Sequence, residues 1–381
     1  MSRTLSRSMM MDRLRLPLIA LSACAFAAPV AAQDGTYPTH EEFLEAAEEA
    51  RSAPLFLSNE PLRMTLRTDI KWLRDERSDS TEVEGSVIFT DSDGSEVERF
   101  VNTRARGNFR REKKNCNFPP LRLNFRTSEM EGTVFEDQDK LKLVTPCNDG
   151  RDDYQRYIFN EFLAYRILNT ITDISFRVRL VEITYEDVNG EYDTRTKIGF
   201  LIEDEQQMAA RHMATIEDVT QFHPARTYAD YSVTAALFNY LIGNTDWSPV
   251  YFHNVKLIRN EQADYFTVPY DFDQSGIVNA RYASVDPSLQ ERVRRVTQRL
   301  YRGFCRPQLD DHSGALAVFA ENRSEIEGLF TDFAAMGYEQ YEMDDAEDKI
   351  DYLEDFWRIV DDHGRYEREI LRNCRDLQTG R

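Results

Sequence analysis

The sequence predicts an α+β fold in two lobes, a strand-rich lobe over residues 55–205 and a mainly helical lobe over 206–381. Two observations lead to this prediction. Between residues 60 and 203 most segments alternate apolar and polar residues, which is the period of a half-buried strand, and one long helical pattern interrupts them. After residue 286 helical patterns predominate. The chain has 381 residues, 41% of them hydrophobic, so it can bury a large core.

The elements of the strand-rich lobe follow from this alternation. An amphipathic helix at 38–53 precedes it, and a hairpin turn is expected at Asp93-Gly94 and another at Asn189-Gly190. The long helix spans 152–172, with acidic residues in its first turn, where the helix dipole favours them. The predicted strands are 61–73, 82–91, 96–107, 121–125, 140–144 and the two arms of the hairpin at 177–203.

The second lobe is predicted to begin with a helix at 205–214. Around its central helix and hairpin it is expected to be mostly helical, with no internal repeat or low-complexity segment. The predicted helices are 230–243, 287–304, 314–330 and 346–374, and the predicted strands are 250–258 and 265–270.

The first 32 residues predict export. Arg13 and Arg15 precede an apolar segment, and Val30-Ala31-Ala32 fits a signal-peptidase site, which leaves residues 33–54 as an N-terminal extension. In an alternative interpretation, the segment that ends at Cys24 is a lipobox and Cys24 carries a lipid anchor. Both interpretations place the protein in the periplasm or outside the cell. No later apolar segment reaches the roughly 20 residues of a transmembrane helix.

Four cysteines remain after such processing, and an even number in an oxidising compartment predicts disulfides. We expect Cys116–Cys147 and Cys305–Cys374, because each pair falls within one predicted lobe. The two other pairings stay open. The cysteines and histidines do not show the spacing of a zinc site.

Charge and motifs exclude several classes of protein. The formal net charge is −20, which disfavours a nucleic-acid partner. The sequence lacks the phosphate-binding P-loop, the dinucleotide-binding glycine motif, the nucleophile elbow of serine hydrolases and the zinc-peptidase helix motif.

Oxygen-bearing side chains gather in the hairpin at 243–276. Asp246 lies in its first loop, Asn254 in its first strand, and Asp271 and Asp273 at the end of the second strand. If that strand continues, the last two carboxylates lie on one side and need a cation between them. A few hard oxygen ligands suit Mg²⁺, or Mn²⁺, bound together with the phosphates of ATP. In phosphoryl transfer, Asp246 would orient the acceptor hydroxyl while the other three hold the metal.

A lysine from the strand-rich lobe should neutralise phosphate charge. Lys142 alternates with two leucines in its strand, and Glu161 in the following helix is expected to pair with it and orient it. His253 is expected to face away from Asn254, because neighbouring side chains in a strand point to opposite sides.

Five blocks give the sequence a family resemblance. In order, they are RARGN at 104–108, KLKLVTPCNDGRDDYQRYIFNEFLAYRI at 140–167, GFLIEDEQQMAAR at 199–211, LIGNTDW at 241–247 followed by HN, and VPYDFDQSG at 268–276. Together they resemble the spore-coat CotH family, whose members have an atypical protein-kinase-like fold with a cleft between two lobes.

The resemblance implies roles for individual residues. Asp246 corresponds to the catalytic-loop aspartate, and Asn254 and Asp271 correspond to its metal-binding partners. Arg106 is expected to contact phosphate, and Glu203 to lie on the nucleotide side of the cleft. Where the family carries a paired-lysine strand, this chain has a proline-rich segment with Arg122, which is an alternative to Lys142 as the phosphate ligand.

The sequence therefore predicts an exported, Mg²⁺- and ATP-dependent kinase that acts on a hydroxyl of a protein or another acceptor. The alternative is a non-catalytic envelope-surface binding protein on the same scaffold. A third interpretation takes Asp271-Phe272-Asp273 as the metal motif of a sugar-nucleotide glycosyltransferase. It is disfavoured, because such motifs lie near the start of an α/β domain.

Overall fold

The computed structural model describes residues 37–306, 308–309 and 312–377. The chain divides into two units, Met1–Pro38 and Thr39–Arg381, and the second contains the helices and strands described here. The signal peptide predicted at 1–32 and the alternative lipid anchor at Cys24 lie outside the described residues.

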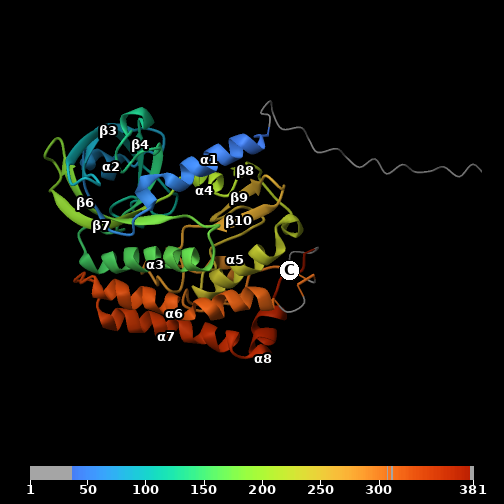
Figure 1. Cartoon of the computed structure of the whole chain (residues 1–381). Coiled ribbons are helices and arrows are strands. Elements are labelled where there is room, and N and C mark those ends of the chain that lie inside the picture. Colours follow the sequence, from blue (N-terminus) through green and yellow to red (C-terminus); the bar gives the residue numbers. More distant parts are fainter. Residues whose placement is uncertain (1–36, 307, 310–311, 378–381) are drawn as a thin grey trace, which may run out of the picture. The chain divides into compact units, whose positions relative to one another are not determined.

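A closed seven-stranded barrel forms the first half of this unit (Figure 1). Its order is β1-β2-β3-β4-β5-β7-β6, and β6 closes it by pairing in parallel with β1, while all other pairs are antiparallel. Closure pairs every strand on both sides. The strands are β1 Leu62–Thr68, β2 Val83–Thr90, β3 Glu96–Ala105, β4 Leu121–Phe125, β5 Lys140–Val144, β6 Val178–Asp187 and β7 Arg195–Ile202.

The barrel interior is filled by apolar residues at alternate positions along its strands. Leu62, Met64 and Leu66 of β1 are buried, as the period of two requires. Phe118 and Phe135 from the connections complete this core. The short helix α2 (Ile70–Glu76) follows β1 directly, so the strand predicted over 61–73 ends at Thr68.

A three-stranded sheet and a group of helices form the rest of the unit. The sheet order is β10-β9-β8, and Figure 1 shows α3, α6 and α7 as successive layers below the barrel. The longer helices pack α3 on α6, α6 on α7, and α5 on β10. The elements are α1 His40–Ser52, α3 Gln155–Ile171, α4 Glu205–Ala210, β8 Ala214–Ile216, α5 Ala229–Leu241, β9 Val255–Asn260, β10 Tyr265–Pro269, α6 Ser313–Ala335, α7 Met343–Val360 and α8 His363–Tyr366.

The prediction of a two-lobed, protein-kinase-like fold is wrong. The structure has a closed mixed barrel with helices, and residues 39–381 form one compact unit. The physical reason is that one apolar core joins residues of the barrel to the helices, while a second apolar core fills the barrel. Val144 of β5 and Phe200 of β7 belong to the same buried cluster as the α3, α5 and α6 side chains. Local periodicity identified the strands and helices but carried no information on whether their apolar faces share one core.

The segment predicted as a helix at 287–304 is also different. It contains one short 3₁₀ turn, Pro287–Leu289, and otherwise runs as turns and extended chain. Its arginines serve other elements: Arg299 donates to the carbonyl of Leu241 at the end of α5, at 3.1 and 3.2 Å, and to the carbonyl of Tyr352. The contact with Leu241 satisfies a helix-end carbonyl that would otherwise lack a partner, and the contact with Tyr352 joins this segment to the middle of α7.

Both expected disulfides, Cys116–Cys147 and Cys305–Cys374, are present, so the favoured pairing is confirmed. They fit an oxidising compartment. In the described part of the chain, no helix is long and apolar enough to cross a membrane.

Candidate functional site

A pocket of about 640 Å³ lies where the barrel ends meet the loops of the β8–β10 sheet. The barrel contributes mostly basic side chains and the loops contribute mostly acidic ones. Six of the eight residues predicted for catalysis, metal binding and nucleotide binding line this pocket: Arg106, Lys142, Asp246, Asn254, Asp271 and Asp273. Residues more than 160 positions apart in the sequence are thus brought to one site.

Three residues of the pocket wall other than glycine have a left-handed backbone. The φ angles are 53° for Phe252, 52° for Asn254 and 63° for Asp271. Residues other than glycine rarely adopt this region, and such conformations cluster at functional sites. The backbone here is therefore shaped to aim side chains into the pocket.

The Asp271-Phe272-Asp273 turn is fixed by α3. The amide of Asp271 donates to the Tyr165 hydroxyl at 2.8 Å, and the Phe272 ring packs on Tyr165 with ring centroids 4.5 Å apart. Strand β10 already ends at Pro269, so the alternation expected through Asp273 does not hold. Both carboxylates nonetheless line the pocket, because the left-handed turn at Asp271 redirects the chain.

The loop that carries Asp246 is held by a chain of amides. Asn244 accepts from the Asp246 amide at 2.9 Å, and its own Nδ2 donates to Asn239 Oδ1 of α5 at 2.8 Å. Both asparagines are buried. The carbonyl of Gly243 also accepts from the Gly276 amide at 3.1 Å, which ties this loop to the turn after Asp273.

The carboxylate of Asp246 already has two partners. Its Oδ1 lies 2.9 Å from His253 Nε2, and its Oδ2 accepts from Asn254 Nδ2 at 3.0 Å. The same Asn254 nitrogen also donates to the Asp246 carbonyl at 2.8 Å. This orientation uses the amide nitrogen of Asn254 and leaves its oxygen as the atom available to a cation.

The expectation that His253 faces away from the site is wrong. It lines the pocket, and its hydrogen bond to Asp246 raises the pKa of the imidazole. Strand β9 begins only at Val255, so residues 250–254 form a turn and the alternation rule does not apply to His253.

A buried cluster behind the pocket holds two acids and one arginine. Arg110 Nη1 lies 3.6 Å from Glu161 Oε2, and Arg110 Nε lies 4.0 Å from Asp273 Oδ2. Burial, followed by the charge of Asp271, raises the pKa of Asp273 to about 7. Burial and then the charge of Asp273 raise the pKa of Glu161 well above its usual range. The cluster thus holds more acidic groups than one guanidinium can balance, and burial favours the protonated form of these acids.

The basic end of the pocket is built on β4 and β5. Lys142 Nζ lies 3.6 Å from Glu205 Oε2, and Lys256 Nζ lies 2.8 Å from the same atom. Burial, and then the charge of Arg106, lower the pKa of Lys142 to about 8. The side chains of Arg106 and Arg122 line the same end and form no hydrogen bond or ion pair within the described residues. One acid therefore faces four cations.

The predicted Lys142–Glu161 ion pair is not formed. Lys142 pairs with Glu205, and Glu161 pairs with Arg110 instead. The reason is the barrel: β5 directs Lys142 to the pocket, whereas the middle of α3 packs into the buried core behind it. Glu161 accordingly does not line the pocket.

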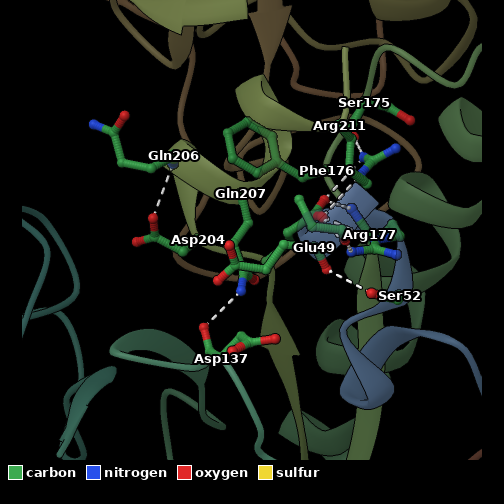
Figure 2. Close-up of polar contacts among 12 residues, drawn as sticks. Glu49, Ser52, Asp137, Ser175, Phe176, Arg177, Asp204, Gln206, Gln207 and Arg211 are labelled. Atoms are coloured by element: carbon green, nitrogen blue, oxygen red, sulfur yellow. Dashed lines mark hydrogen bonds and ion pairs between the residues drawn. The ribbon is translucent and has the colours of Figure 1, made fainter. Parts of the chain in front are cut away.

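Glu203 lies outside the pocket as well, and it is fully buried. Its carboxylate accepts from Arg177 Nε at 2.8 Å and from Arg211 Nε and Nη2 at 2.8 and 2.9 Å. Figure 2 shows Arg177 and Arg211 converging from two segments, next to the end of α1. The same view shows the bonds from Gln206 to Asp204 and from Gln207 to Asp137 that hold α4. Glu203 thus anchors α4 rather than contacting a ligand in the pocket.

The acidic end of the pocket offers ligands for a divalent cation that is bound together with phosphate. In the described part of the chain, no group of three or more His, Cys, Asp or Glu side chains is arranged as a metal site. Two carboxylates, Asp271 and Asp273, do face one pocket with unbalanced charge. Mg²⁺ is commonly held by one or two carboxylates while phosphates and water supply its other ligands, so this donor set suits a metal that arrives with a phosphorylated ligand.

Sequence reasoning missed several residues of the site. Arg110 could have been expected, since a buried acid on α3 requires a nearby cation. Tyr165 and Tyr282 gave no signal, because an aromatic residue in an apolar stretch is usually core. Tyr282 hydrogen-bonds Asp273 and packs under the Arg110 guanidinium.

A comparison of the chain with models of known protein families finds no match, and a comparison with curated proteins finds none. The resemblance to the spore-coat family therefore stays a prediction.

Proposed function

We propose that this pocket binds a nucleoside triphosphate with a divalent cation, Mg²⁺ or Mn²⁺, and transfers its terminal phosphoryl group to a hydroxyl. One observation supports this above all others. A basic end faces an acidic end with Asp271 and Asp273 across a single pocket. At the basic end, the side chains of Arg106 and Arg122 lie beside Lys142 and have no partner in the described part of the chain. The basic end complements phosphate oxygens and the acidic end complements a metal bound to them.

The chain's own residues have distinct parts in this proposal. Arg106, Arg122 and Lys142 bind the phosphates, and Asp271 and Asp273, with the oxygen of Asn254, would hold the cation. The cation supplies charge neutralisation of the transferred group. Asp246, oriented by His253 and Asn254, positions the acceptor hydroxyl and accepts its proton.

The volume agrees with a ligand of this size. About 640 Å³ lies within the roughly 300–1,000 Å³ typical of small-molecule sites. The acceptor is a hydroxyl compound or a hydroxyl side chain of a protein. We further propose that the protein is exported, as its two disulfides favour.

Calorimetric titration of the full chain with ATP, with and without Mg²⁺, tests the binding step. We expect saturable binding that strengthens with Mg²⁺ in the parent protein and loses this dependence in Asp271→Asn. Transfer of labelled terminal phosphate to hydroxyl-rich acceptors tests the chemistry. Absence of heat and of any thermal shift with every nucleotide, in protein shown to be folded, would remove the proposal.

A second candidate is a binding protein that captures a phosphorylated ligand without chemistry. The observation that favours it is Asp246, whose two carboxylate oxygens both have partners already. Nucleotide binding that is unaffected by Asp246→Asn, with no phosphoryl transfer in either protein, would favour this candidate. A cellular phenotype that survives the double change Asp246→Ala and Asp271→Ala would do the same.

A further inference from the structure

A second, smaller pocket of about 130 Å³ lies on the side of the Glu203 cluster. It shares no residue with the pocket described above. Three arginines from three separate segments line it: Arg166 from α3, Arg177 before β6 and Arg211 after α4. A cavity this small is well below the roughly 300 Å³ of drug-sized sites, so it suits an ion or one functional group.

Arg166 is the central observation. Its side chain is half-buried and makes no hydrogen bond or ion pair within the described residues. Burial lowers its pKa, and the charge of Glu325 opposes this without forming an ion pair. A desolvated cation without a partner is costly, so such a guanidinium is normally paired with an anion.

The other two arginines are already in use, but not fully. Both bind Glu203, so two guanidinium groups share one carboxylate. Arg177 uses Nε and Nη2 for Glu203 and for the carbonyl of Ala50, which leaves its Nη1 without a partner among the described residues. Arg211 also donates to the carbonyl of Ser175 at 2.7 Å, which fixes it in place (Figure 2).

Among the described residues, none of the remaining charged groups around the pocket pairs with Arg166. Asp173 lines the rim and is exposed. His212, next to Arg211, contributes no positive charge near pH 7, because burial lowers its pKa to about 4. Three arginines thus line the pocket together with Asp173; Glu203 binds two of them, and Glu325 acts on Arg166 without forming an ion pair. Phe56 covers one wall.

We propose that this pocket is a binding site for a small oxyanion of the phosphate and sulfate class. Arg166 provides the principal contact, and Arg177 provides a second donor. Planar guanidinium groups bind such oxygens with paired, charge-assisted hydrogen bonds. The proposal does not depend on the function proposed for the larger pocket.

Equilibrium dialysis of the full chain with labelled inorganic phosphate, at constant ionic strength, tests this site. The larger pocket is also basic, so the test is made in a background that carries Arg122→Gln and Lys142→Met. We expect Arg166→Gln to weaken the remaining phosphate binding at least about tenfold, the loss of one charged hydrogen-bond partner.

Arg156→Gln is the matched control, since Arg156 lies on the same helix but pairs with Asp345, away from the pocket. It should leave phosphate binding unchanged. Equal loss in Arg156→Gln and Arg166→Gln would mean a general charge effect, and unchanged binding in Arg166→Gln would mean another site; each result overturns the proposal. If Arg166→Gln does not fold, crystals of the parent protein soaked in selenate decide. An anomalous peak beside Arg166 supports the site, and its absence at saturation refutes it.

Discussion

Two buried acid–arginine clusters in this protein have opposite charge balance. Around Glu203, one carboxylate is bound by two arginines at 2.7–2.9 Å. Around Arg110, one guanidinium serves two carboxylates, Glu161 and Asp273, at 3.6 and 4.0 Å. The first cluster is closely hydrogen-bonded and holds more cations than acids, and the second is loosely paired and holds more acids than cations.

The difference in charge balance indicates different roles for the two clusters. When a buried acid is tightly paired, each partner is needed for stability. Removing one partner leaves the others as uncompensated charges in a medium of low dielectric constant. Loose pairing with surplus acid leaves a raised pKa and a place for an additional cation. Only the second cluster reaches the large pocket, through Asp273 and Arg110.

The largest effect is expected from Glu203→Gln. It leaves Arg177 and Arg211 buried without their shared anion, which should lower the free energy of unfolding by about 3–5 kcal/mol. Denaturant unfolding measures this. Glu186→Gln breaks an exposed ion pair with Arg67 on the barrel surface and should cost less than about 1 kcal/mol. Equal losses in the free energy of unfolding for the two variants would mean that the Glu203 cluster stabilises the fold no more than an exposed ion pair does.

The next effect is the pH dependence of stability that arises from Asp273. Its folded pKa of about 7 lies above the usual value of 3.8, so between these values the folded state binds more protons than the unfolded state. Stability from this group is therefore greatest below about pH 4 and is lost as pH rises to about 7, by on the order of 2–4 kcal/mol. Asp273→Asn should remove this component, as the difference between parent and variant unfolding at pH 5 and pH 8 would reveal. If the free energy of unfolding changes with pH in the same way in the parent and in Asp273→Asn, the raised pKa of Asp273 is contradicted.

A third expected result has the opposite sign to that at Glu203. At pH 8, Asp273→Asn should make the protein more stable, yet it should weaken Mg²⁺-dependent ATP binding at least about tenfold, since one metal-facing carboxylate is lost. Calorimetry with and without Mg²⁺ measures the second effect. Asp153→Asn, which removes an acid outside the pocket that pairs with Arg151, is the control. If Asp273→Asn is more stable but its ATP binding depends on Mg²⁺ as in the parent, Asp273 does not hold the metal.

The smallest effect concerns the basic end. Because the pKa of Lys142 is lowered to about 8, ATP affinity should fall as pH rises from 7 to 9, when the ammonium loses its charge. Lys142→Met should bind about tenfold more weakly at pH 7 and lose this pH dependence. Lys142→Arg should retain binding at pH 9. An unchanged pH profile in Lys142→Met would show that Lys142 does not contact the phosphates.

Local patterns were sufficient for most of the elements and for much of the pocket. The alternation in β1–β7, the turn at Gly94 and the helical period of α3 and α6 depend on neighbours in the sequence, so they could be predicted from it. The same holds for the grouping of Asp246, Asn254, Asp271 and Asp273, because one short hairpin carries them. The disulfide pairing was predicted because each pair of cysteines falls within one half of the chain.

What only the tertiary structure decided are the partners of buried charges and the way in which layers share a core. Glu161 pairs with Arg110 rather than Lys142, His253 faces the site, and one of two apolar cores joins part of the barrel to the helices. Such choices depend on contacts between residues far apart in sequence, where desolvation and charge balance, rather than periodicity, determine which arrangement has the lowest free energy.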